Sequence, residues 1–349
     1  MCALIITFAH TQDLSMEVNP KVTFVMPAYN AEKNIAEAIE SARRQTYREW
    51  AMIIVDDCST DSTYEIAMEY ARKDSRITVL RTDRQSGSAW LPRKEAIEHA
   101  RTELVSPLDA DDYIEDNYLE KLLREKEKLS VQAIYSTMYR MDGDTCIPLM
   151  EKSLCGKSFI GKECVVLTLD GWRIDCGGGI IDKKLYMQTF EKCGVALSCY
   201  KDEILTRYLL WYADNVAFST AKYIYRKNPD SITHKVSAKQ FDFLINHREL
   251  LQFVIDRYGL GSEEHIRAVK QNFHGIADSI RLLLKGSYSE DAKSYAESQI
   301  RESYKQVDWK LLWRHDSKWY WFALRGGMRA GMIGMSILDA LKSVKDRLK

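Results

Sequence analysis

The chain has 349 residues, enough for two or three domains, and it is 46% hydrophobic and 29% charged, as globular proteins are. Lys plus Arg and Asp plus Glu each number 50, so the formal net charge is zero, which argues against a dedicated nucleic-acid-binding protein. The eight cysteines include no C-x-x-C pair, which indicates reduced thiols in a cytosolic protein. No uncharged apolar run approaches the length of about 18 residues that spans a bilayer, so we expect a protein kept in the cytoplasm.

Strand and helix patterns alternate over the first third of the chain. Strands are expected at 22–26, 51–55, 77–80 and 104–108, and helices at 33–46, 62–73 and 93–101. This alternation predicts an α/β fold with a mostly parallel sheet flanked by helices. In such sheets, ligands bind outside the carboxyl ends of the strands.

The pattern becomes mixed after residue 130 and helical after about 238. The expected elements are a strand at 132–139, a helix at 202–213, and short strands at 216–219 and 222–226. Gly177–Gly179 indicates a loop or a close backbone approach. We therefore expect an irregular extension at 1–20, a catalytic domain at 21–235 and a helical C-terminal region at 236–349.

Acidic residues follow two of the expected strands. Asp56 and Asp57 come after the second strand, and the string from Asp109 to Asp112 comes after the fourth. Carboxylate oxygens at a strand end suit Mg²⁺ or Mn²⁺, which bridge protein carboxylates to substrate phosphates. The alternative is a solvated turn in which Asp112 caps a helix, just as Asp61 can cap the helix that follows Asp57.

Four strings, in order and at matching spacing, resemble the family 2 glycosyltransferases of the GT-A fold. They are V-T-F-V-M-P-A-Y-N at 22–30, I-E-S-A-R-R-Q-T-Y at 39–47, V-D-D-C-S-T-D at 55–61 and L-D-A-D-D at 108–112. A further string at 200–210 is similar to the family's E-D-x-x-L-x-x-x-L-L helix start, and one at 225–233 to its Y-R-x-H-x-x-S-I-T segment, with Asn228 where His is common.

The resemblance implies a role for each matching position. The residues that it assigns to the nucleotide sugar are Pro27, Tyr29, Asp57, Arg93, Asp109 and Ala110. Asp57 would read the uracil edge of a UDP-sugar, and Asp111 of the D-x-D motif would hold the Mg²⁺ or Mn²⁺. The catalytic base would be Asp202, with Glu203 as the alternate because Lys201 replaces the family's preceding Glu.

The implied reaction transfers a sugar from a nucleotide-sugar donor, UDP-sugar being favoured, to a hydroxyl of a glycan or lipid-linked acceptor. One base opposite a metal-bound diphosphate implies inversion at the anomeric carbon. A role in surface polysaccharide synthesis is implied by the family resemblance alone. Two alternatives are a nucleotidyltransferase that forms the sugar nucleotide, which would show a Gly-rich basic loop after the first strand, and a non-catalytic sugar-nucleotide-binding module.

The C-terminal tail combines aromatic and basic residues. Residues 301–349 contain 11 Lys and Arg against 5 Asp and Glu, and Trp313, Trp319 and Trp321 lie among them. This composition suits a helix that contacts the inner face of the membrane peripherally. A helix packed on the catalytic domain is the slightly favoured alternative.

Overall fold

The computed structural model describes residues 19–142, 145–169, 172–174, 176–193, 201–226 and 237–315. The chain divides into two compact units. The first consists of Met1–Leu197 and Leu205–Asn228, and the second of Ser198–Ile204 and Pro229–Lys349. The expected domain limits at 21–235 and 236–349 remain a prediction.

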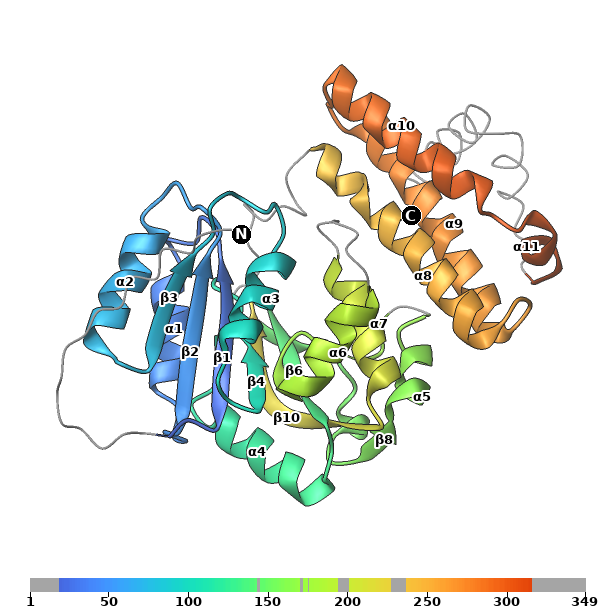
Figure 1. Ribbon diagram of the computed structural model, residues 1–349. Helices are drawn as coiled ribbons and strands as arrows, with labels where there is room; N and C mark the ends of the chain where they lie inside the picture. The colour runs from blue at the N-terminus through green and yellow to red at the C-terminus, as the bar shows by residue number, and fades with distance from the viewer. Residues whose placement is uncertain are drawn as a thin grey trace. The chain divides into compact units, whose positions relative to one another are not determined.

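The first unit is built around one sheet (Figure 1). Its strands are β1 (Val22–Ala28), β2 (Trp50–Asp56), β3 (Ile77–Arg81), β4 (Leu104–Pro107), β5 (Tyr113–Ile114), β6 (Ala133–Asp142), β7 (Thr145–Pro148), β8 (Ser158–Ile160), β9 (Gly179–Asp182) and β10 (Asn215–Tyr225). Its helices are α1 (Ile35–Arg43), α2 (Thr63–Lys73), α3 (Trp90–His99), α4 (Tyr118–Leu129), the 3-10 helix η1 (Lys152–Leu154), α5 (Gly161–Val166) and α6 (Lys183–Cys193). The helix α7 (Lys201–Tyr212) begins in the second unit and continues into the first.

The strand order β3-β2-β1-β4-β9-β6-β10-β5 confirms the predicted α/β fold. The expected parallel arrangement holds for β3, β2, β1 and β4. Beyond β4 the sheet is mixed, because β9 runs antiparallel to both β4 and β6, whereas β10 runs parallel to β6. The two short strands expected at 216–226 are one strand, β10, with a register shift between Phe218 and Lys222.

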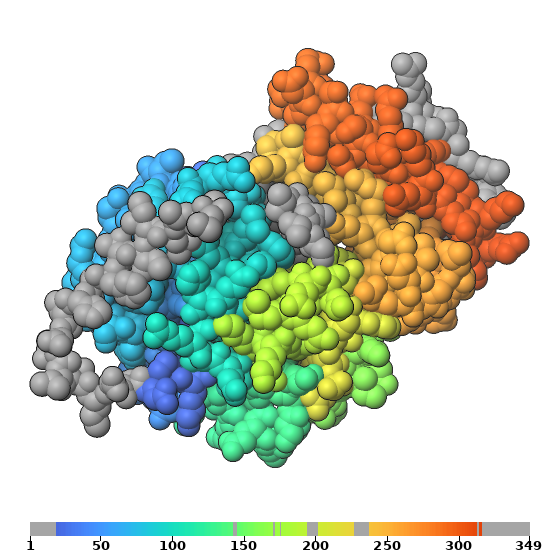
Figure 2. Space-filling model, in the orientation of Figure 1, coloured from blue at the N-terminus to red at the C-terminus, as the bar shows by residue number. Residues whose placement is uncertain are grey.

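Helices cover both faces of the parallel strands. Alternate residues of β1 (Val22, Phe24 and Met26) belong to one buried cluster with α1 and α4 residues, including Ile35 and Leu122. The neighbouring β1 residues point the other way, toward α3, which packs on β1 and β2. Figure 1 shows α3 and α6 on this second face, and the space-filling view shows that they hide most of the strand atoms behind them (Figure 2). Each fully buried side chain of this kind contributes about 1.5–3 kcal/mol to stability, so packing on both faces stabilises the strands whose carboxyl ends carry the acidic residues.

The second unit is helical, as expected. It contains η2 (Ala238–Asp242), α8 (Phe243–Tyr258), α9 (Glu263–Lys285), α10 (Glu290–Lys305) and α11 (Trp309–His315). The helices α8 and α9 are separated near residue 260, where Gly259 and Gly261 both have positive φ and the Ser262 side chain then caps α9. No helix among the described residues is long and apolar enough to cross a membrane.

Candidate active site

A tight acidic loop follows β4, as the sequence predicted. The Leu108 N–H donates to the Val25 carbonyl of β1 at 3.2 Å, and the Asp112 N–H donates back to the Asp109 carbonyl at 3.1 Å. Asp109 keeps 40% of its side chain exposed and Asp111 is half-buried, whereas Asp112 is only 2% exposed. Asp112 is therefore not the solvated helix cap that was the alternative, and the open side of the loop presents Asp109 and Asp111.

Two residues of the β10 end hold Asp112 in place. The Arg226 N–H donates to its Oδ1 at 3.0 Å, and the Tyr223 hydroxyl is hydrogen-bonded to the same carboxyl group. Burial, followed by the charges of Asp109 and Asp111, raises the pKa of Asp112 to about 8. The charges of Asp109 and Asp111 thus disfavour a third charge on the buried Asp112, and a cation bound beside them would oppose this effect.

Arg93 and Asp109, both expected to bind the nucleotide sugar, lie against each other. The Arg93 guanidinium, on the buried side of α3, is 2.6 Å from Asp109 Oδ1. The helix α3 begins two residues after Ser88. Just before it, Gly87 has a φ of 81°, a backbone conformation that residues with a Cβ rarely adopt. Arg93, in the first turn of α3, therefore lies beside the acidic loop.

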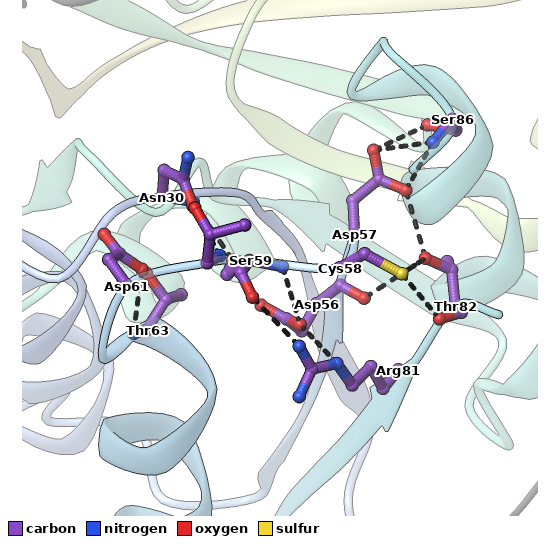
Figure 3. A network of polar contacts seen from close by, with 11 residues as sticks. Asn30, Asp56, Asp57, Cys58, Ser59, Asp61, Thr63, Arg81, Thr82 and Ser86 are labelled. Atoms are coloured by element: carbon purple, nitrogen blue, oxygen red, sulfur yellow. Dashed lines mark hydrogen bonds and ion pairs between the residues drawn. The ribbon is translucent and has the colours of Figure 1, made fainter. Parts of the chain in front are cut away.

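Asp57, expected to read the nucleotide base, lies at the end of β2 and is 4% exposed. Its carboxylate accepts hydrogen bonds from the segment after β3 (Figure 3). The donors are the Ser86 N–H at 2.8 Å, the Ser86 hydroxyl at 2.9 Å, the Thr82 hydroxyl at 3.1 Å and the Gly87 N–H at 3.4 Å. The carboxylate thus organises this loop, which the sequence had not indicated.

The neighbouring Asp56 has a different role. It is fully buried, forms an ion pair with Arg81 at 3.2 Å and accepts the Ser59 N–H at 3.1 Å. Burial raises the pKa of Asp56. Of the two adjacent aspartates, Asp56 therefore serves the fold, and Asp57 faces the loop that borders the site.

The turns after β1 and β2 are joined side by side. The Asn30 side chain accepts the Thr60 N–H at 2.9 Å, and the Ala31 N–H donates to the Thr63 hydroxyl at 2.7 Å. Asp61 accepts the Thr63 N–H at 3.0 Å, but the residue that precedes α2 is Ser62, whose side chain makes no capping hydrogen bond, so the expected capping role of Asp61 is not confirmed. Pro27 is buried within β1 and Tyr29, 37% exposed, follows the strand. These contacts place Pro27, Tyr29 and Asp57 at one edge of the sheet.

The Q-T-Y segment after α1 is structural in this chain. Gln45 is fully buried, and its side chain donates to the Ser41 and Glu115 carbonyls at 3.0 and 2.8 Å. Its side-chain oxygen accepts the Leu119 N–H at 3.0 Å. This glutamine therefore fastens the segment that follows the acidic loop.

Asp202 and Glu203 lie in the first turn of α7, which belongs to the second unit, whereas the helix from Leu205 onward belongs to the first. Asp202 is exposed and Glu203 is half-buried. Leu205, further along the same helix, is buried. Both carboxylates are near the positive end of the helix dipole, so the choice between them remains a prediction.

Two features stand apart from the predicted chemistry. The open hollow of about 550 Å³ between the start of β4 and α6 is lined by residues such as Arg101 and Lys184, at the end of β4 opposite the acidic loop. Asn228 and the tail from residue 316, including Trp319 and Trp321, lie outside the described residues. Among the described cysteines, six are free thiols, as expected.

The structure adds Tyr223, Arg226, Ser86 and Thr82 to the residues that border the site. Sequence patterns could not single them out, because Tyr223 reads as an ordinary strand residue and lies 114 positions from its partner Asp109. Only the sheet order brings them together.

An α/β sheet with acidic groups at the carboxyl ends of two parallel strands, β2 and β4, followed by C-terminal helices, is typical of the GT-A type of nucleotide-binding fold. Residues 23–180 match the model of Glycosyl transferase family 2, so this part of the chain is similar to that family.

The relatives support the same family. The chain is 41% identical over 104 residues to TuaG of Bacillus subtilis, named as a teichuronic acid biosynthesis glycosyltransferase, and the match covers 30% of this chain and 41% of TuaG. It is 34% identical over 159 residues to WcaA of Escherichia coli, named as a colanic acid biosynthesis glycosyl transferase, and the match covers 43% of this chain and 56% of WcaA. The matches thus span about half the length of these relatives.

The crystal structure of S. aureus TarS 1–349 in complex with UDP-GlcNAc shares the fold, with a TM-score of 0.66 and 18% sequence identity. The match covers 93% of this chain and 92% of that chain. It therefore includes the helical C-terminal region as well as the sheet.

Proposed function

We propose that this chain is an inverting glycosyltransferase that moves a sugar from a UDP-sugar to a hydroxyl of a glycan or lipid-linked acceptor in surface polysaccharide synthesis. The observation that carries the proposal is the grouping of Asp57 and the Asp109–Asp112 loop at the carboxyl ends of β2 and β4, inside the family-matched residues. TarS binds UDP-GlcNAc, and TuaG and WcaA are named for polysaccharide synthesis, which favours this donor and this product class.

Different side chains are proposed to bind different parts of the donor. Pro27, Tyr29 and Asp57 border the place where the base and ribose would lie, next to the loop that Ser86 closes. Arg93, which is held against Asp109, and Ala110, which follows Asp109 in the chain, would contact the donor. These groups would orient the donor before transfer, which is a large part of the rate enhancement in two-substrate reactions.

The acidic loop fits Mg²⁺ or Mn²⁺. Among the described residues, no three His, Cys, Asp or Glu side chains could hold an ion by themselves. In nucleotide sites these ions take one or two carboxylates and complete their shell with substrate phosphates and water. Asp111 is the proposed ligand, and the bound ion would stabilise the negative charge that develops on the leaving diphosphate.

Asp202 is the proposed base, with Glu203 as its alternate. An ionised carboxylate at the start of α7 is stabilised by the helix dipole and can accept the proton of the acceptor hydroxyl. Attack from the side opposite the diphosphate gives inversion.

The aromatic and basic tail is proposed to contact anionic lipid, where a lipid-linked acceptor would be available. Flotation with anionic liposomes tests this for the full chain against a chain truncated at 307. Recovery of both proteins in the bottom fraction would exclude the membrane contact.

The proposed activity is tested by incubating the purified chain with Mn²⁺ and a panel of nucleotide sugars, and measuring the nucleotide released. UDP release from one UDP-sugar, increased by an added acceptor, is the expected result. Pyrophosphate release would indicate a nucleotidyltransferase instead, and binding without turnover would indicate a non-catalytic module.

A further inference from the structure

A single buried phenol contacts both ends of the acidic loop. The Asp109 N–H donates to the Tyr223 hydroxyl oxygen at 3.0 Å, and the Tyr223 hydroxyl is hydrogen-bonded to the Asp112 carboxyl group. Tyr223 comes from β10 and is 1% exposed. A tyrosine hydroxyl has one hydrogen to donate, so it accepts from Asp109 and donates to Asp112.

Burial raises the pKa of Tyr223 well above its usual value, so the phenol keeps its hydrogen at neutral pH. The same hydroxyl thus fixes the backbone where the loop begins and the side chain where it ends. Asp111 lies between these two anchored residues, and its position follows from theirs.

The ring of Tyr223 is itself seated against Gly178. A Cβ added at Gly178 would lie 2.5 Å from Tyr223 Cδ2, 2.8 Å from Ser136 Oγ and 2.9 Å from Tyr118 Oη. The Ser136 N–H donates to the Gly178 carbonyl at 3.1 Å, which holds this backbone in place. The close approach expected for the Gly177–Gly179 string is therefore made at the ring that supports the acidic loop.

We infer that Tyr223, seated on Gly178, is a positioning residue that sets the geometry of the Asp109–Asp112 loop for the metal-bound diphosphate of the donor. The inference rests on the proposed function. It assigns to Tyr223 no contact with the donor, because its ring is buried behind the loop. Groups that orient metal ligands from behind raise metal affinity by about 10- to 100-fold.

The test compares Tyr223→Phe with Tyr135→Phe in the full chain. Tyr135, in the adjacent strand β6, is also fully buried, and its hydroxyl has no hydrogen-bond partner among the described residues. Both variants lose one buried hydroxyl, but only the first loses contacts with the acidic loop. The probe is Mn²⁺ with UDP, and free Mn²⁺ is measured by its electron paramagnetic resonance signal.

We expect Tyr223→Phe to weaken Mn²⁺ binding in the presence of UDP by about 10- to 100-fold, and to leave UDP binding without metal unchanged. Tyr135→Phe should match the wild type in both measurements. A general loss of structure would reduce the affinities for Mn²⁺ and for UDP together. A loss of Mn²⁺ affinity alone would therefore indicate that Tyr223 positions the acidic loop. Wild-type Mn²⁺ affinity in Tyr223→Phe would overturn the inference while leaving the proposed function intact.

Two further outcomes are decisive. If Tyr223→Phe does not fold, Gly178→Ala keeps the phenol and displaces its ring, and it should weaken Mn²⁺ binding in the same way. If neither variant folds, Tyr223 serves the fold as a whole and the assignment is overturned. If the wild-type chain binds no Mn²⁺ in the presence of UDP, the proposed metal site is wrong, and the proposed role of Tyr223 is wrong as well.

Discussion

Replacing Asp57 by alanine should affect both the nucleotide affinity and the stability of the first unit. The Asp57 carboxylate accepts hydrogen bonds from Thr82, Ser86 and Gly87, so its acceptor positions are already in use. A uracil N–H must therefore replace one of these loop donors rather than a water molecule. For that reason we place the loss of UDP affinity in the lower part of the usual range, at about 1–1.5 kcal/mol, or roughly tenfold.

The stability term follows from the same contacts. A hydrogen bond to a charged group contributes about 1.5–3 kcal/mol. Ser86 is only half-buried, so its freed N–H can turn to water, and we expect Asp57→Ala to lower the free energy of unfolding by about 2 kcal/mol in total. Calorimetric titration with UDP and urea denaturation measure the two quantities independently.

Ser86→Ala is the matched control. It removes the hydroxyl that donates to Asp57 at 2.9 Å but keeps the backbone N–H contact at 2.8 Å. We expect a stability loss of about 1 kcal/mol, with UDP affinity within about twofold of wild type. Unchanged UDP affinity in Asp57→Ala would make Asp57 a loop anchor only. An equal loss of affinity in both variants would assign the effect to the loop and not to the carboxylate.

Three further predictions concern the metal, the base and the thiols. Asp111→Asn, like excess EDTA, should abolish sugar transfer while thermal unfolding stays at the wild-type temperature, and full activity in EDTA would contradict the metal site. Asp202→Asn should bind UDP normally and lose about 10²–10⁴-fold in transfer rate, whereas Glu203→Gln should stay active; the reverse pattern would make Glu203 the base. Burial raises the pKa of Cys164 to about 12, so its thiol stays protonated at pH 8, and iodoacetamide should label the exposed Cys146 but not Cys164 in the native chain, as mass spectrometry can show.

Much of the fold follows from local sequence patterns. Continuous apolar runs placed β1, β2, β3 and β4 within a few residues, because strands buried on both faces leave no polar positions. The spacing of Ile35, Ala38 and Ile39 likewise identified the buried face of α1. The helices α4 and α6 and the antiparallel strand β9 were not predicted, because this part of the chain gives no regular alternation of elements.

The candidate site divides in the same way. The sequence by itself determined which carboxylates end the parallel strands, since Asp57 and Asp109 directly follow apolar runs whose direction in the sheet is fixed by the helices between them. Only the tertiary structure decided their environments. It buries Asp112, pairs Asp109 with Arg93, and engages Asp57 with Ser86. It also joins Asp109 to Tyr223, 114 positions away, and such pairings depend on strand order, which local periodicity does not encode.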